Sequence, residues 1–135
     1  MTATCDEIES TLTFLDSWED RFQYVIDLGK GLPPFPDAEK TEARRVHGCQ
    51  SSVWLISSRK ADGALSLQAT SDAFIVSGLI AILLAFYAGK TPTEAVTADA
   101  EGYFKRLGLS AHLSATRRNG LHAMIQRVRV EASSL

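Results

Sequence analysis

Cys49 is the residue of this sequence most capable of chemistry, because it carries a thiol in a short polar segment beside a strand-like run. Gly48 precedes it, Gln50 and two serines follow it, and the apolar run VWLI begins at Val53. A thiol on a loop beside a rigid strand can be presented to a partner while its backbone stays fixed. The segment therefore predicts thiol chemistry carried out by one sulfur atom at a time.

The residues alone leave four interpretations of Cys49 open. An inert core cysteine is common, because free cysteine is often buried, whereas the polar neighbours favour an accessible loop thiol. A metal site fits poorly, because His47 and Cys49 are separated by one residue and no second ligand pair has zinc spacing. A catalytic triad would need His47, His112 or His122 at the thiol, and none of them lies in a recognisable motif. We expect no metal site and assign His47 no catalytic role.

Length, charge and cysteine content predict one cytoplasmic domain. The 135 residues suffice for a single core, so we expect one domain over residues 1–135, with residues 1–5 flexible. A net charge of -2 gives no general attraction to nucleic acid or to an anionic membrane. The N-terminus is polar and acidic, unlike a secretory signal, and Cys5 and Cys49 make no disulfide framework. We therefore expect no nucleic-acid partner and a reducing compartment.

One apolar stretch resembles a membrane span but is too short for one. Residues 73–88 contain no charge over sixteen positions and are bounded by Asp72 and Lys90. A membrane-spanning helix needs about 20 apolar residues. The stretch is therefore predicted to be a buried central helix, and no membrane partner is expected.

A small sheet is predicted around the cysteine segment. Residues 53–56 form a short apolar run, and residues 65–69 alternate apolar with polar side chains. Residues 61–63, Ala-Asp-Gly, are typical of a hairpin turn between two such strands. Residues 44–47 are predicted to form a third, short strand, which places residues 48–50 at the connection between strands.

Helices are predicted before and after these strands along the chain. Ser17 is expected to cap a helix, Ser71 to cap the apolar helix with Asp72 in its first turn, and Thr91 to open a capping box with Pro92. The expected helical segments are residues 6–16, 17–28, 73–88, a helix from 92, 103–107 and 114–130, with a polar helical turn over 37–43.

The last predicted helix combines an apolar stripe with one conspicuous arginine. Its inward face is formed by Leu121, Met124, Ile125 and Val128. Arg117 falls near the middle of that stripe, and an arginine aimed at a core is unfavourable unless it is paired. Its guanidinium could extend to water or form an ion pair with a carboxylate near the cysteine. Arg127, Arg129 and His122 point off the stripe and are expected to be solvated.

Four linked segments of the chain resemble the SufE family of sulfur acceptors. They are DSWEDRFQYVIDLGKGLP at 16–33, GCQSSVWL at 48–55, SDAFIVSGLIAILLAFYAGKTP at 71–92 and HLSATRRNGLHAMIQRVR at 112–129. Several motifs in the same order are far more specific than one cysteine. The resemblance implies a compact α+β fold in which a three-stranded antiparallel sheet packs against several helices.

The resemblance also implies roles for individual residues. Cys49 matches the cysteine on which the family forms a persulfide. Asp72 matches an acidic position near that loop, and Arg117 matches an arginine that positions the loop or contacts the partner enzyme. Residues that shape the loop and the following strand are matched by Gly48, Gln50 and Trp54. Asp72 and Arg117 are both expected to flank the cysteine loop and could pair with each other.

By this resemblance the chain acts as sulfur acceptor and activator of a pyridoxal-phosphate cysteine desulfurase. It would carry a persulfide on Cys49 and pass the sulfur to an iron–sulfur scaffold complex or another sulfur acceptor. It would need no cofactor of its own, because the pyridoxal phosphate belongs to the desulfurase, and it would not work as a stand-alone enzyme. A loop that shelters Cys49 until the partner arrives would protect the sulfur from oxidation.

Three other functions remain open on the sequence. A paralogous acceptor could serve a second desulfurase and supply sulfur for tRNA modification. A thiol-based redox sensor would form a sulfenic acid on Cys49, with Cys5 as its only available resolving cysteine. An interaction module could use the surface of residues 73–88 without any chemistry.

Overall fold

A β-hairpin forms the sheet of the computed structural model, which describes residues 3–135. Strands β1 (Val53–Arg59) and β2 (Leu65–Ser71) pair antiparallel, with Val53 opposite Ser71 and Arg59 opposite Leu65. The connecting turn is closed by a 2.8 Å hydrogen bond from the Lys60 amide to the Ala64 carbonyl. The predicted hairpin and the α+β class are confirmed.

The predicted third strand at residues 44–47 is wrong, and the sheet within residues 3–135 has two strands. Glu42–Arg44 forms a 3-10 turn, η2, which brings the chain to the sheet edge only at Arg45. Arg45 makes an isolated bridge with Trp54, and the Val46 amide donates to the Val53 carbonyl at 2.9 Å. The chain turns away at His47 and Gly48, so too few residues remain extended to continue the ladder.

Helices account for most of the remaining chain. They are α1 (Cys5–Phe14), α2 (Trp18–Lys30), α3 (Phe74–Tyr87), α4 (Pro92–Thr97), α5 (Ala100–Arg106), α6 (Leu109–His112) and α7 (Ala115–Ser133), with a further 3-10 turn η1 (Asp37–Glu39). Ser17 caps α2 by accepting from the Asp20 amide at 3.1 Å, and Thr91 forms the predicted capping box with Glu94. The single helical turn of α6 was not predicted.

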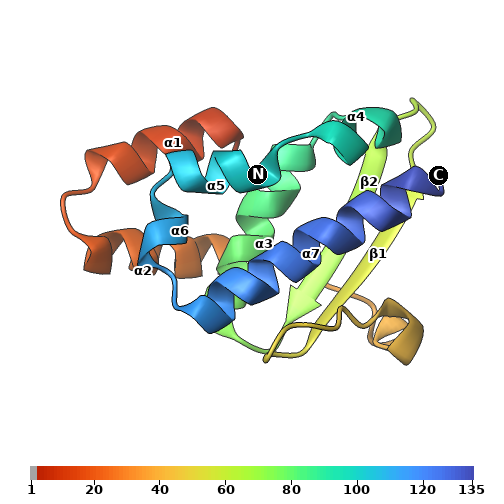
Figure 1. Ribbon diagram of the computed structural model, residues 1–135, viewed down its shortest axis with the longest axis horizontal. Coiled ribbons are helices and arrows are strands. Elements are labelled where there is room, and N and C mark those ends of the chain that lie inside the picture. The colour runs from red at the N-terminus through yellow and green to blue at the C-terminus, as the bar shows by residue number, and fades with distance from the viewer. Residues whose placement is uncertain (1–2) are drawn as a thin grey trace.

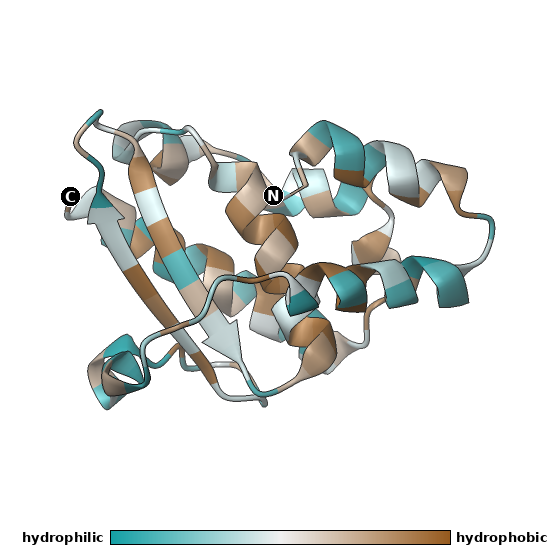
Figure 2. Ribbon diagram, turned by 180° about the vertical axis from the view of Figure 1, so that it is seen from behind, coloured by the Kyte–Doolittle hydropathy of each residue, from teal (hydrophilic) through white to brown (hydrophobic). Residues whose placement is uncertain are grey.

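The apolar helix α3 lies near the centre of the molecule (Figure 1). Figure 2 shows it as a mostly hydrophobic helix, and its side chains pack in the main core with Leu79, Ile80, Ile82 and Leu83 almost fully buried. Each such side chain contributes about 1.5–3 kcal/mol when it leaves water. Within residues 3–135, no helix combines the length and the apolar character needed to cross a bilayer.

The start of α3 differs from the prediction. Ala73, not Ser71, occupies the N-cap position, and Asp72 precedes the helix instead of lying in its first turn. Ser71 is the last residue of β2 and pairs with Val53, so its backbone belongs to the sheet. Its hydroxyl accepts a hydrogen bond from the Ala73 amide at 3.2 Å. Residues 71–73 therefore form a tight strand-to-helix connection.

Helix α7 runs along the hairpin, whereas α1, α2, α5 and α6 gather at the opposite end of the molecule (Figure 1). The predicted inward stripe of α7 is confirmed, because Leu121, Met124, Ile125 and Val128 are all buried. The first half of α7 also contacts the loop between Val46 and Val53, where Gly120 accepts a hydrogen bond from Cys49.

Candidate functional site

Cys49 lies in a loop of residues 47–52 whose two ends are fixed. The Val46–Val53 backbone hydrogen bond closes one end. At the other, the Ser52 amide donates to the Asp72 carboxylate at 3.1 Å, and the Asp72 amide donates to the Ser52 carbonyl at 3.4 Å. The loop is thus a short protrusion on a rigid base.

Gly48 sets the direction of Cys49. Its φ of 93° lies in the left-handed region that glycine enters at little cost. The turn at Gly48 aims the cysteine at α7, where the half-buried thiol donates a 3.4 Å hydrogen bond to the Gly120 carbonyl. A Cβ built on Gly120 would lie 3.5 Å from Sγ, so the bare helix backbone at this position is in close contact with the sulfur.

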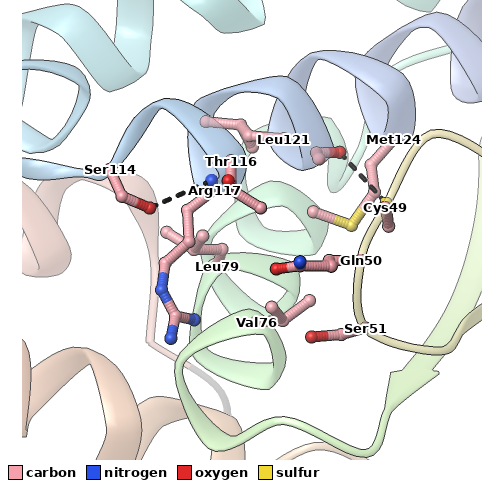
Figure 3. A pocket seen from close by; sticks show the side chains of 11 residues that line it. Cys49, Gln50, Ser51, Val76, Leu79, Ser114, Thr116, Arg117, Leu121 and Met124 are labelled. Atoms are coloured by element: carbon pink, nitrogen blue, oxygen red, sulfur yellow. Dashed lines mark hydrogen bonds between the residues drawn. The ribbon is translucent and has the colours of Figure 1, made fainter.

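A hollow of about 220 Å³ opens beside the thiol. Its lining residues are Cys49, Gln50, Ser51, Val76, Leu79, Ser114, Thr116, Arg117, Gly120, Leu121 and Met124. Figure 3 shows Cys49 and Arg117 on opposite sides of this space, with Gln50 and Met124 between them. The buried lining residues Val76, Leu79, Leu121 and Met124 are apolar, whereas the exposed ones, Ser114, Thr116 and Arg117, are polar. The volume is below the range typical of pockets for drug-sized ligands.

The surroundings of Cys49 favour the protonated form of its thiol. Burial raises its pKa above the ordinary value, and the positive charge of Arg45 offsets part of that rise. The hydrogen bond to the Gly120 carbonyl also favours the S–H form, because a thiolate has no proton to donate. Cys49 in this position is therefore a poor nucleophile, since the thiolate is the reactive species.

Arg117 lies on the exposed rim. Its backbone amide donates to the capping hydroxyl of Ser114 at 3.2 Å, while its side chain is exposed. The sequence left two interpretations of Arg117 open, a guanidinium that extends to water and an ion pair near the cysteine. The structure favours the first. In the described part of the chain, no ion pair joins it to Asp72, whose carboxylate accepts a hydrogen bond from the Ser52 amide.

The structure gives Arg127 a role that the sequence did not predict. Instead of being solvated, its guanidinium donates to the carbonyl oxygens of Arg45 at 2.9 Å and Ala43 at 2.6 Å. It also pairs with Glu131, which accepts a hydrogen bond from Ser57 of β1. The i,i+4 spacing of Arg127 and Glu131 was the only local signal of this network.

Arg129 and His122 serve a different part of the molecule. Arg129 pairs with Glu101 at 2.6 Å and donates to the Ala98 carbonyl, so it too is not freely solvated. His122 contacts the same carboxylate at 3.2 Å and is exposed, as predicted. Both side chains tie α7 to the start of α5.

The histidines are engaged away from the thiol. His47 is 71% exposed and contacts Glu42 at 2.7 Å. His112 stacks on the Trp18 ring at a centroid distance of 3.6 Å, and His122 contacts Glu101. This placement disfavours a cysteine–histidine catalytic pair.

Cys5 has separate surroundings. It is the first residue of α1, after the N-cap Thr4, and it lines a larger hollow of about 680 Å³ between α1, α2 and α3. The part of the expected flexible segment that comprises Met1 and Thr2 lies outside the described residues. Because Cys5 and Cys49 line different hollows, Cys5 is poorly placed as a resolving cysteine.

The chain is similar to known proteins over nearly its whole length. A family model described as "SufE: Fe-S metabolism associated domain" matches residues 6–132. A SufE-like protein of Rhizobium meliloti (strain 1021) is 45% identical over 130 residues, which cover 94% of this chain and 93% of that protein. One of Rhizobium etli is 44% identical over 133 residues, covering 96% and 90%.

The fold is also found in a solved structure. The solution structure of a hypothetical protein from Thermus thermophilus superposes with a TM-score of 0.78. It is 21% identical in sequence, with 96% of this chain and 93% of that chain covered. This likeness establishes a shared fold.

Proposed function

Because the chain belongs to the SufE family, whose domain is associated with iron–sulfur metabolism, we propose that it accepts sulfur from a cysteine desulfurase on Cys49. The observation that carries the proposal is the half-buried thiol of a short loop, held against α7 beside a hollow. A persulfide needs a nucleophilic sulfur that is presented to one partner and shielded from all others.

The proposed reaction is a displacement at sulfur. The Cys49 thiolate attacks the outer sulfur of a persulfide on the desulfurase, and the S–S bond of that persulfide breaks as the new one forms. The desulfurase cysteine leaves as a thiolate, and Cys49 becomes Cys49–S–SH. One sulfur atom moves between two cysteines, so no external oxidant or reductant is consumed.

Docking must change the state of the Cys49 loop for this reaction to occur. In the free protein, burial and the Gly120 hydrogen bond favour the thiol over the thiolate. Movement of the loop out of the hollow would break that hydrogen bond and restore contact with water. The nearby charge of Arg45 would then favour the thiolate. We propose that the desulfurase induces this movement.

The other predicted site residues have separate proposed roles. Gly48 allows the backbone turn that aims Cys49, Asp72 fixes the far end of the loop through Ser52, and Gln50 lines the hollow. Arg117, which is exposed at the rim, is proposed to contact the partner. Its replacement by alanine is expected to weaken stimulation of the desulfurase, and unchanged stimulation would remove Arg117 from the mechanism.

The chain is proposed to need no cofactor of its own. Pyridoxal phosphate on the desulfurase would supply the carbon–sulfur bond cleavage that releases sulfur from cysteine. The Cys49 persulfide would then pass to an iron–sulfur scaffold complex by a second displacement of the same kind. The protein acts in this scheme as a carrier between two partners.

Mass spectrometry after incubation with a cysteine desulfurase and cysteine tests the proposal. The wild-type protein should gain the mass of one sulfur atom on the peptide that contains Cys49, and Cys49→Ser should gain none and give no stimulation of the desulfurase. Cys5→Ser is the matched control and should behave as the wild type. Sulfur uptake by Cys49→Ser equal to that of the wild type would refute the proposal.

A further inference from the structure

We propose that Arg127 is a positioning residue for the Cys49 loop. It holds the segment that enters the loop against α7, so that the tip moves while the base stays in place. The functional reason for this restraint rests on the proposed function. Whether Arg127 restrains the loop can be tested without any desulfurase.

The contacts of Arg127 lie on the chain just before the loop. Its two terminal nitrogens donate to the carbonyl oxygens of Ala43 and Arg45, at 2.6 and 2.9 Å. Hydrogen bonds from a charged donor are roughly twice as strong as neutral ones, and a guanidinium can hold two acceptors in a fixed geometry. The next residue, Val46, makes the backbone hydrogen bond that closes the loop.

The side chain of Arg127 is itself held in place by an ion pair with Glu131. Its Nε donates to Glu131, which also accepts from the Ser57 hydroxyl on β1. The side chains of Arg127 and Glu131 are only 25% and 16% exposed, so solvent screens this pair less than it screens ordinary surface pairs. The guanidinium therefore links the Glu131 carboxylate, which is hydrogen-bonded to the hairpin, to the carbonyl oxygens of Ala43 and Arg45.

Helix α7 thus holds the loop at two points of different strength. At the tip, the bond from the neutral Cys49 thiol to Gly120 is 3.4 Å long. At the base, Arg127 makes two shorter, charge-assisted bonds. Gly120 and Arg127 are seven residues apart, which is about 10 Å along a helix. The tip contact should break first, and the base should limit how far the loop opens.

Holding the base also keeps a charge near the sulfur. Arg45, whose carbonyl Arg127 binds, is the residue whose positive charge acts on Cys49, and its guanidinium lies 5.5 Å from the centre of the Trp54 ring. With its backbone fixed, Arg45 keeps its position when the tip moves. Arg127 would thereby preserve the electrostatic environment of the thiolate.

Arg129 provides a matched control on the same helix. Its side chain is also 25% exposed, and it also binds a glutamate and a backbone carbonyl, those of Glu101 and Ala98. These partners lie around the start of α5. Loss of Arg129 should therefore remove a similar set of interactions without touching the entry to the Cys49 loop.

The experiment compares Arg127→Gln with Arg129→Gln in the isolated protein. Alkylation of Cys49 by iodoacetamide is followed by mass spectrometry of its peptide, and unfolding by denaturant is measured in parallel. Arg127→Gln is expected to speed alkylation about fivefold or more, because the base no longer restrains opening. Arg129→Gln should stay within about twofold of the wild type. Equal rates in the two variants, or no acceleration in Arg127→Gln, would overturn the proposal.

A measurement on the wild type keeps the proposal testable even if Arg127→Gln fails to fold. Native-state hydrogen exchange should show the Val46 amide exchanging at least about tenfold more slowly than the Gln50 amide, because the base stays closed while the tip opens. Similar exchange at the two amides would contradict a fixed base. Neither measurement involves sulfur transfer, so this inference can fail while the proposed function stands, and the reverse also holds.

Discussion

The two cysteines of this protein make an informative pair, because both are partly buried, free and beside a hollow. Cys5 begins a regular helix, and its carbonyl accepts a hydrogen bond from the Tyr103 hydroxyl at 3.1 Å. Cys49 lies on a six-residue loop, after a glycine with positive φ, and its own sulfur makes the contact that holds it. Partial burial is common to both, so the two cysteines differ in their backbone, which is helical at Cys5 and irregular at Cys49.

The largest expected effect concerns how a partner changes the two thiols. Adding a cysteine desulfurase should speed alkylation of Cys49 by about tenfold or more if docking releases the loop from Gly120, as proposed. Cys5, in a helix away from the loop, should react at the same rate with and without the partner. Peptide-resolved mass spectrometry measures both rates in one sample, with a desulfurase that lacks its own reactive cysteine to prevent sulfur transfer.

Two results would contradict this gating. Unchanged alkylation of Cys49 would mean that the loop is as open in the free protein as in the complex. Acceleration of Cys5 to the same degree would mean that the partner loosens the whole fold.

The second prediction separates backbone strain from packing at Gly48. Gly48→Ala should lower the free energy of unfolding by about 1–2 kcal/mol, because alanine is disfavoured at positive φ. The added Cβ would also come within 3.1 Å of the Ala123 side chain. Denaturant titration measures the loss, and alkylation of Cys49 reports whether the cysteine has turned away from α7.

Gly63→Ala in the hairpin turn is the matched control. Gly63 has nearly the same φ, 90°, and open space around the position of a Cβ. It should lose stability by strain alone and leave Cys49 alkylation unchanged. If both variants alter Cys49 equally, the turn at Gly48 has no special role in aiming the cysteine.

The sequence predicted correctly those features that depend on residues close together in the chain. The caps at Ser17 and Thr91 and the buried stripe of α7 were predicted correctly, because each depends on residues a few positions apart. The Cys49 loop beside a strand was predicted for the same reason. The third strand failed, because pairing at residues 44–47 depends on where the 3-10 turn before them places the chain.

The features that could not be predicted from the sequence are contacts across long separations. Arg127 binds carbonyls 84 and 82 residues earlier in the chain, and backbone acceptors leave no trace in side-chain patterns. The contact between Cys49 and Gly120 spans 71 residues. The hollow beside the thiol could likewise be found only once α3, α7 and the loop were placed together.

The third prediction uses Gly120 to separate stability from function. Gly120→Ala should stabilise the fold by up to about 1 kcal/mol, because alanine is favoured over glycine inside a helix. The added methyl would lie at ordinary contact distance, 3.5 Å, from the Cys49 sulfur and would reduce the hollow beside it. Sulfur loading should therefore fall severalfold although the protein is more stable. Higher stability with unchanged sulfur transfer to Cys49 would show that the outer sulfur of the Cys49 persulfide does not need the space over Gly120.

The smallest expected effect is on the pH dependence of stability. Burial raises the pKa of Cys49 in the folded protein, so above about pH 8.5 an unfolded chain loses a proton that the folded chain keeps. The stability contributed by the protonated thiol is complete below the unfolded pKa and is lost as the pH rises toward the folded pKa. Cys49→Ser should therefore lose less stability than the wild type between pH 7 and about pH 9.5. The difference should be well under about 1 kcal/mol, because solvent partly screens the half-buried thiol.

Ionisation of Tyr87 affects the wild type and Cys49→Ser alike. Burial also raises the pKa of Tyr87 to about 12, so Tyr87 weakens the fold at higher pH in both proteins. Because that contribution is common to the wild type and Cys49→Ser, the difference between their pH profiles isolates the cysteine. Identical pH profiles of stability for the two proteins would mean that the loop already exposes Cys49 to water in the free protein. Cys49 would then not be a sheltered thiol.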